Sequence, residues 1–212
     1  MTDIRSIVTK NRIKMGLLSC MKEKGYDTIL NKDIISKAQI SPRTYYHYYS
    51  DKNIILQEIE AVLLKGIKKA NDLDYQYVTE VNARLTDQAN VELAEKEFKH
   101  IIDFCTTNKD VLNILLSTNG DINFLTQVWQ LVSMEVKRRI DFLNQNNFID
   151  VGTDGDIPVQ IVHNVYTGAV LETIITWLQN KNDLTPYQVR KILGRVQVES
   201  PADLLLSLKR KK

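Results

Sequence analysis

Every proline in this chain stands where a helix can begin. Three of them follow a Ser or Thr, in Ser41-Pro42, Thr185-Pro186 and Ser200-Pro201, and Pro158 comes two residues after Asp156. Ser, Thr and Asp side chains cap helices, and proline is favoured at the first helical position because its missing N–H is not needed there. This placement is typical of a chain built from helices.

Apolar residues recur at spacings of three and four, which predicts an all-α protein with about ten helices. The expected helices cover residues 3–24, 31–38, 42–49, 51–70, 91–107, 110–117, 122–145, 158–180 and 186–193. In the first of them we expect an inward face made of Ile4, Ile7, Val8, Leu17, Leu18 and Met21, with Gly25 as a left-handed stop. The polar stretch 71–90 has poor periodicity and is predicted to be a junction.

Bulk composition excludes several classes of protein. With 212 residues, 43% of them hydrophobic and 25% charged, the chain can bury a sizeable core. No run approaches the roughly 18 apolar residues of a membrane helix, and the first residues lack the apolar stretch of a secretion signal. We therefore expect a cytoplasmic protein without a membrane partner. Cys20 and Cys105 lie in apolar patterns and are expected to be buried free thiols rather than a disulfide.

Positive charge is concentrated in the N-terminal third. Up to Ala70 there are 13 Lys and Arg against 7 Asp and Glu, and beyond it 15 against 19. Solvated helix faces also carry such excesses, but a positive sign is what a phosphate-binding region needs.

The segment SPRTYYHYY, residues 41–49, places four tyrosines within five positions of one short helix. Ser41 is its expected cap. Tyr45 and Tyr49 fall four apart on one face, so we assign them to the core. The short helices 31–38 and 42–49, followed by a long one, have the outline of a helix-turn-helix, whose second helix lies in the major groove of DNA.

The remaining side chains of this helix suit a nucleic-acid surface. Thr44 and Tyr46 can donate to phosphates, and Arg43 and His47 can bond to base edges. Pro42 or the ring of Tyr48 can press on a thymine methyl, and Lys52 adds a cation beside the N–H groups that open the next helix. The alternative is an aromatic-rich helix that only packs against its neighbours.

Residues 22–56, KEKGYDTILNKDIISKAQISPRTYYHYYSDKNIIL, resemble the DNA-binding domain of the tetracycline-repressor (TetR) family of bacterial transcription regulators. The matching elements are Gly25-Tyr26, Asp33-Ile34, Ala38, Ile40-Ser41, Thr44, Tyr46, Tyr49 and Lys52. The resemblance implies a helix-turn-helix domain at 1–50, a connecting helix at 51–71 and a larger ligand-binding and dimerisation domain at 72–212.

It also implies a set of DNA contacts. These are Asn31, Lys32, Pro42, Arg43, Thr44, Tyr46, His47, Tyr48 and Lys52. Two positions where the family often has glycine hold Gln39 and Arg43 instead. The first short helix, 31–38, lacks the usual Ser or Thr before it, which leaves Thr28 or Asn31 as its cap.

Helix 158–180 is apolar around most of its circumference, so it needs cover on more than one side. A second subunit or the centre of a monomer can supply that cover. The resemblance implies the first: a homodimer joined through 158–180 and 186–193, which binds double-stranded DNA at an inverted repeat.

The resemblance also implies a repressor released by a small-molecule effector of unknown identity. The alternative is a regulator that responds to a protein partner or to no ligand. Trp129, His163 and Tyr166 are our candidates for ligand binding, because they are bulky or polar interruptions in aliphatic helices. Aromatic residues at helical spacing also serve simply as core.

An enzyme is the competing class. The histidines at 47, 100 and 163 have no metal-ligand spacing, and phosphate-loop, nucleophile-elbow and HExxH motifs are missing from the sequence. We therefore predict no catalysis, no metal and no cofactor.

Overall fold

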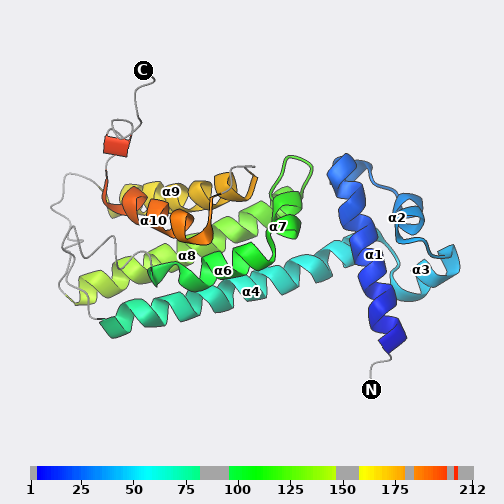
Figure 1. Cartoon of the computed structure of the whole chain (residues 1–212), viewed down its shortest axis with the longest axis horizontal. Coiled ribbons are helices and arrows are strands. Elements are labelled where there is room, and N and C mark those ends of the chain that lie inside the picture. Colours follow the sequence, from blue (N-terminus) through cyan, green and yellow to red (C-terminus); the bar gives the residue numbers. More distant parts are fainter. Residues whose placement is uncertain (1–3, 82–95, 147–157, 180–183, 200–202, 205–212) are drawn as a thin grey trace. The chain divides into compact units, whose positions relative to one another are not determined.

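The computed structural model describes residues 4–81, 96–146, 158–179, 184–199 and 203–204. Within these ranges it contains α-helices, one 3-10 turn and no strand, which confirms the all-α prediction. Figure 1 shows the helices α1 (Ile4–Glu23), α2 (Asn31–Ala38), α3 (Pro42–Tyr48), α4 (Lys52–Val81), α6 (Lys99–Thr107), α7 (Lys109–Leu115), α8 (Ile122–Gln145), α9 (Val159–Gln179) and α10 (Pro186–Val198), with the 3-10 turn at Tyr26–Thr28.

The helices form two compact units. The N-terminal unit comprises Met1–Gly66 and Asp110–Gln127, and the C-terminal unit comprises Ile67–Lys109 and Val128–Lys212. Helices α4 and α8 each contribute residues to both.

In the N-terminal unit, α2 and α3 lie next to α1 (Figure 1). Gly16 of α1 lies so close to α2 that a Cβ there would be 3.0 Å from the Ile34 carbonyl and 3.1 Å from the Ala38 Cβ. The core consists of fully buried apolar and aromatic side chains: Ile13, Leu17, Met21, Ile29, Ile34, Tyr45, Tyr49 and Ile55. A small residue in α1 therefore sets the close packing of the first two helices.

Two expectations for α1 are wrong. Leu17, Leu18 and Met21 are buried as expected, but Ile4, Ile7 and Val8 are 77%, 47% and 53% exposed, because the buried face begins at Ile13. Gly25 has φ −59° and ψ 143°, so it is not left-handed. Instead the chain continues directly into the 3-10 turn, where the Thr28 hydroxyl donates to the Gly25 carbonyl at 2.8 Å.

Helix α4 continues to Val81, so the predicted junction at 71–90 is wrong as far as residue 81; residues 82–95 lie outside the described ranges. The polar residues of this stretch make tertiary contacts. The buried Asp74 carboxylate accepts the backbone N–H groups of His100 and Ile101, both at 2.9 Å, and lies 2.8 Å from the His100 ring. Asp74 therefore caps the first turn of α6 from another helix, which satisfies donors that α6 itself leaves unpaired.

The last helix of the C-terminal unit begins as predicted. The Thr185 hydroxyl accepts the Gln188 N–H, which confirms Thr185 as the cap, and the Gln188 side chain accepts the Thr185 N–H to complete a capping box. Helix α10 packs against α9 and α6. It extends to Val198, past the predicted end at 193.

Cys20 and Cys105 are buried and free, as expected. None of the helices in the described ranges has the length and apolar character needed to cross a membrane.

Candidate nucleic-acid interface

Helix α3 begins at the predicted cap. The Ser41 Oγ accepts the Thr44 N–H at 3.1 Å and lies 2.8 Å from the Thr44 hydroxyl, while Pro42 occupies the first turn. The cap and the proline together fix the start of α3 locally.

Two of the four tyrosines belong to the core, as predicted. Tyr45 is 0% and Tyr49 2% exposed. The Tyr45 hydroxyl donates to the Asn31 Oδ1 at 3.0 Å, and the Tyr49 hydroxyl donates to Glu58 at 2.9 Å. Burial raises the pKa of Tyr45 to about 12. Both buried hydroxyl groups thus have acceptors, as buried polar groups require.

The other side of α3 is open to solvent. Arg43 and His47 are exposed, and Tyr46 is 58% exposed. The ring of Tyr46 contacts Tyr45 edge-on with centroids 5.2 Å apart, and the ring of His47 contacts Tyr48 edge-on at 4.8 Å. These ring contacts orient side chains that remain accessible from solvent.

The predicted DNA contacts differ in exposure. The exposed members are Lys32, Pro42, Arg43, Tyr46 and His47, and the half-buried members are Asn31, Thr44, Tyr48 and Lys52. All of them belong to the N-terminal unit, where they lie on α3 and at the starts of α2 and α4.

The start of α2 is built differently from the prediction. Leu30 is the capping residue, and its N–H donates to the Asp33 carboxylate at 2.9 Å. That carboxylate also accepts from Lys24 at 2.6 Å, a hydrogen bond that lowers the pKa of Asp33. The expectation that Thr28 or Asn31 forms the cap is wrong, because a carboxylate in the first turn of the helix replaces it.

Lys52 has a structural role that the sequence did not suggest. Its ammonium group donates to the carbonyls of Tyr26, Asp27 and Ile29 at 2.7, 3.2 and 2.9 Å. It also lies 4.5 Å from the centre of the Tyr26 ring. Lys52 thus ties the start of α4 to the turn between α1 and α2.

The ligand-binding candidates lie in the C-terminal unit. Trp129 on α8 is 40% exposed. The His163 Nε2 lies 2.9 Å from the Ser133 carbonyl and 3.3 Å from the Ser133 hydroxyl; because a carbonyl only accepts, Nε2 carries the proton. Burial raises the pKa of Tyr166 to about 12, with the charge of Arg139 opposing the rise. The contact of His163 with Ser133 joins α9 to α8, and Ser133 lies one helical turn after Trp129.

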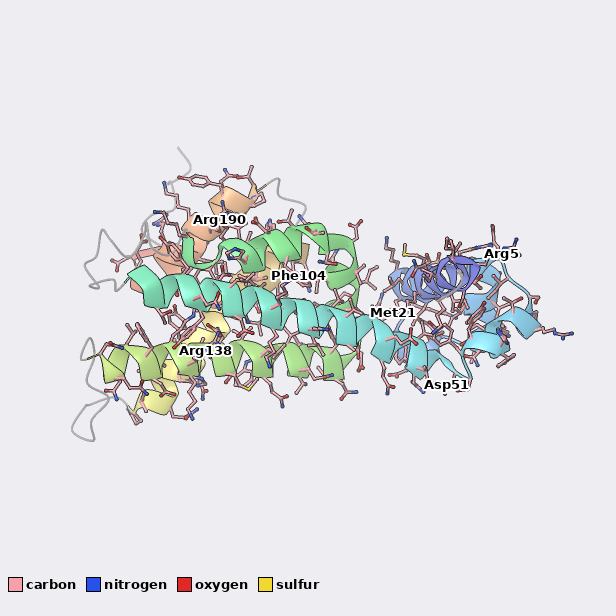
Figure 2. All side chains as sticks on the ribbon, turned by 90° about the horizontal axis from the view of Figure 1, so that it is seen from below. Arg5, Met21, Asp51, Phe104, Arg138 and Arg190 are labelled. Carbon is pink, nitrogen blue, oxygen red and sulfur yellow. The ribbon has the colours of Figure 1, made fainter. Side chains whose placement is uncertain are left out.

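Sequence reasoning missed a buried ionic cluster in the same unit. Arg139 forms ion pairs with Glu97 and Glu135, and Arg138 pairs with Glu135 and with Asp72 (Arg138 is labelled in Figure 2). Burial raises the pKa of Glu135 to about 7 even though Arg138 beside it lowers that pKa. The spacing of Glu135, Arg138 and Arg139 indicated ion pairs within a helix but not their burial.

Within the described residues, no group of three or more His, Cys, Asp or Glu side chains could hold a metal ion. The exposed side of α3 offers hydrogen-bond donors and a guanidinium, which are groups that can bind phosphates and base edges.

Comparisons with known proteins found a matching family model and a similar solved structure. Residues 92–197, half of the chain, match a TetR-type family model described as "Transcriptional regulator C-terminal region". A solved structure, the TetR transcriptional regulator from Streptococcus agalactiae 2603V, is 23% identical with a TM-score of 0.53, and the match covers 91% of this chain and 94% of that one. The comparison with curated proteins found no match. Because the family model spans half of the chain and the fold agrees with it, this chain belongs to the TetR family of transcriptional regulators.

Proposed function

We propose that this chain is a sequence-specific regulator that inserts α3 into the major groove of duplex DNA. The observation that carries the proposal is the division of α3 into a buried face, with Tyr45 and Tyr49, and an exposed face with Arg43, Tyr46 and His47. Packing accounts for the first face only. An exposed helix face made of donors, in the basic third of the chain, is what groove binding requires.

Two residues are assigned to base reading. Arg43 is exposed in the first turn of α3 and can donate two parallel bonds to guanine. His47, one turn later on the same face, can bond to a base edge. Pro42 and the ring of Tyr48 flank them and supply apolar contact to a thymine methyl.

A second group is assigned to the DNA backbone. The hydroxyls of Thr44 and Tyr46, together with Asn31 and Lys32 at the start of α2, would contact phosphates and set the position of α3. Lys52 also belongs to this group, but its ammonium already donates to three carbonyls. It would therefore supply positive charge near the phosphates rather than a direct hydrogen bond, while it holds the turn. The domain boundaries at 1–50, 51–71 and 72–212 remain part of this proposal.

The outer face of α9 supports a homodimer. Ile161, Val162 and Val165 are 53%, 47% and 67% exposed, whereas Ile174 and Leu178 are buried. An exposed apolar stripe of this kind marks an interaction surface. Further along α9, a groove of about 400 Å³ lies between α9 and α10. The residues that line it are Ala169, Glu172, Thr173, Thr176, Trp177, Leu184, Val189, Ile192 and Val196.

Two copies joined through 158–180 and 186–193 would carry two α3 helices. Such helices reach successive major grooves on one side of the duplex when they are about 34–36 Å apart, so the operator is an inverted repeat.

Val165→Asp should dissociate the dimer in sedimentation experiments. Val62→Asp is the matched control, because Val62 on α4 is also 67% exposed. Equal behaviour of the two variants would contradict this interface.

We further propose that the regulator is a repressor released by a small molecule in the C-terminal unit, with Trp129, His163 and Tyr166 as candidate contacts. An effector can act only if it binds the DNA-competent and the released conformations unequally. The alternative is a response to a protein partner or to no ligand. A small-molecule screen that changes neither the thermal stability nor the DNA affinity would favour that alternative.

Selection of bound sequences from random duplex DNA tests the proposal. Wild-type protein should enrich an inverted repeat, and its affinity should fall steeply with salt. The double variant Arg43→Ala, His47→Ala should bind DNA without enrichment, and Lys65→Ala, which removes an exposed cation from α4, should enrich the same repeat as the wild type. If the wild type enriches no sequence, α3 does not read bases and the proposal fails.

A further inference from the structure

The turn between α2 and α3 places a glutamine, Gln39, in a left-handed backbone conformation that favours glycine. Gln39 has φ 52° and ψ 51°, and within the described residues it is the one non-glycine residue with positive φ. A side chain with a Cβ is disfavoured in this left-handed region, so such a residue persists only where its surroundings hold it. The direction of α3 depends on this residue, because only Ile40 and the cap Ser41 separate it from the helix.

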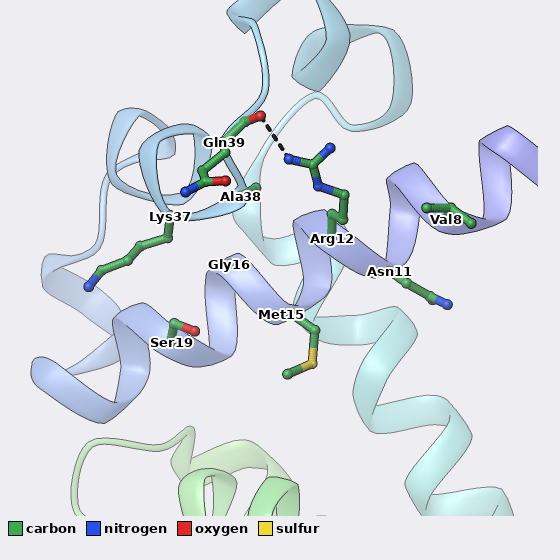
Figure 3. Close-up of a pocket in the computed structure, with 9 residues that line it drawn as sticks. All are labelled: Val8, Asn11, Arg12, Met15, Gly16, Ser19, Lys37, Ala38 and Gln39. Atoms are coloured by element: carbon green, nitrogen blue, oxygen red, sulfur yellow. Dashed lines mark hydrogen bonds between the residues drawn. The ribbon is translucent and has the colours of Figure 1, made fainter.

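Helix α1 supplies the contact that holds the turn. The close approach of Gly16 to Ala38 places the preceding turn of α1 beside Gln39. There the Arg12 Nη2 donates to the Gln39 carbonyl at 3.0 Å. Figure 3 shows the guanidinium of Arg12 reaching from α1 to this carbonyl at the end of α2.

We propose that Arg12 is a positioning residue for DNA recognition, which fixes the left-handed Gln39 and through it the direction of α3. The turn has its own backbone bonds, from Gln39 N–H to Ser36 at 3.1 Å and from Ile40 N–H to Ile35 at 3.3 Å. These bonds close the end of α2 but do not engage the Gln39 carbonyl. Arg12 holds that carbonyl from outside the helix-turn-helix. The inference rests on the proposed function of α3.

A direct role for Arg12 at a phosphate makes different predictions. An arginine that neutralises a phosphate contributes to all DNA binding, and its loss lowers the salt dependence by about one ion. A positioning residue acts on the alignment of α3, so its loss weakens operator binding and leaves non-operator binding and the salt dependence unchanged. Glycine adopts the left-handed conformation without strain, so a glycine in place of Gln39 should make Arg12 dispensable.

The test compares Arg12→Met, Gln39→Gly and the double variant, with Lys22→Ala at the other end of α1 as the matched control. Methionine keeps the apolar stem of Arg12 and removes its donors. Arg12→Met should lower the affinity for the selected operator about five- to tenfold, the effect of losing one solvent-exposed hydrogen bond, with an unchanged salt slope. In the double variant this loss should disappear. Lys22→Ala should leave the operator-to-nonspecific ratio unchanged.

A reduced salt slope for Arg12→Met, or a loss of affinity that persists in the double variant, would overturn the positioning role. Amide hydrogen exchange measures the local stability of the turn in the absence of DNA. Exchange at Gln39 and Ile40 should accelerate in Arg12→Met, whereas the double variant should exchange at the same rate as Gln39→Gly alone. Unchanged exchange in Arg12→Met would refute the inference even if α3 reads DNA as proposed. Accelerated exchange in a protein that selects no operator would refute the proposed function alone.

Discussion

The two units of this regulator place their charges in opposite ways. In the N-terminal unit the cations Lys32 and Arg43 of the proposed interface lie at the surface, and the buried tyrosine hydroxyls are neutral and paired. In the C-terminal unit Glu97, Glu135 and Arg139 are 7%, 9% and 8% exposed and form one cluster. Exposed charged side chains can bind a ligand such as DNA at little cost to the stability of the fold. Buried charges instead depend on one another.

The cluster in the C-terminal unit has a structural consequence. Arg138 and Arg139 on α8 connect to Asp72 on α4 and to Glu97 beside α6. These ion pairs join α8 to α4 and to the segment before α6, so removing one partner leaves a buried charge without its counter-charge. Substitutions in the two units should therefore affect different properties: stability in the C-terminal unit and DNA affinity in the N-terminal unit.

The largest expected effect comes from Arg139→Ala. This change removes the ion pair of the buried Glu97 and one of the two ion pairs of Glu135, which keeps Arg138; the loss should cost about 3–5 kcal/mol of unfolding free energy. Denaturant unfolding measures it. Arg190→Ala is the matched control, because Arg190 pairs with Asp103 at 3.5 Å and Asp103 is 54% exposed. Its loss should cost less than about 1 kcal/mol. Equal losses would remove the distinction between buried and exposed charge.

An intermediate effect is expected for Glu60, the buried carboxyl that departs from the pattern of the N-terminal unit. Burial, with Asp121 adding to it, raises the pKa of Glu60 to about 7. Between about pH 4.5 and 7 the unfolded chain loses this proton while the folded protein keeps it, so stability falls as pH rises. The unfolding free energy lost by pH 8, relative to acid pH, should be about 3 kcal/mol.

Glu60→Gln should remove this fall in stability, so its unfolding free energy should differ less between about pH 5 and about pH 8 than that of the wild type. Glu58→Gln is the control on the same helix: although burial opposes it, hydrogen bonds from Lys14 and Tyr49 lower the pKa of Glu58. Stability conferred by Glu58 is therefore present above its unfolded pKa and lost on acidification. A Glu60→Gln variant with the pH dependence of the wild type would show that this carboxyl ionises normally in the folded protein.

The smallest effects should separate two adjacent tyrosines. Tyr45→Phe removes the bond to Asn31 and should cost about 1 kcal/mol of stability. Tyr46→Phe should change stability by less than about 0.5 kcal/mol, because Tyr46 is exposed. It should weaken binding to operator and unrelated DNA alike, since phosphate contacts carry no sequence information. Thermal unfolding and DNA titration of both variants measure these effects, and a reversed pattern would contradict the assigned faces of α3.

Local signals made much of the fold predictable. Ser41-Pro42 and Thr185-Pro186 act over a few residues, and both caps form as expected. The assignment of Tyr45 and Tyr49 to the core needed only the helical period. These features depend on neighbours in sequence, so a single chain reveals them.

Features that depend on distant residues were missed. The Asp74 contact that caps α6 spans 26 residues, and the carbonyls that hold Lys52 lie 23 to 26 residues away. Sequence pattern treats such polar residues as junction or surface. The exposure of Ile4 and Val8 has the same origin, because apolar spacing does not show where the neighbouring helix ends.

The most direct test of the central claim is a base-by-base titration of the selected operator with wild-type protein and Arg43→Ala. Each base pair is changed in turn, and the loss of affinity is measured. For the wild type, a change at the base pair read by Arg43 should cost about 1–3 kcal/mol in each half-site. Arg43→Ala should be insensitive at those two symmetric positions and retain its sensitivity elsewhere. An identical profile for the two proteins would show that the exposed face of α3 does not read the operator through Arg43.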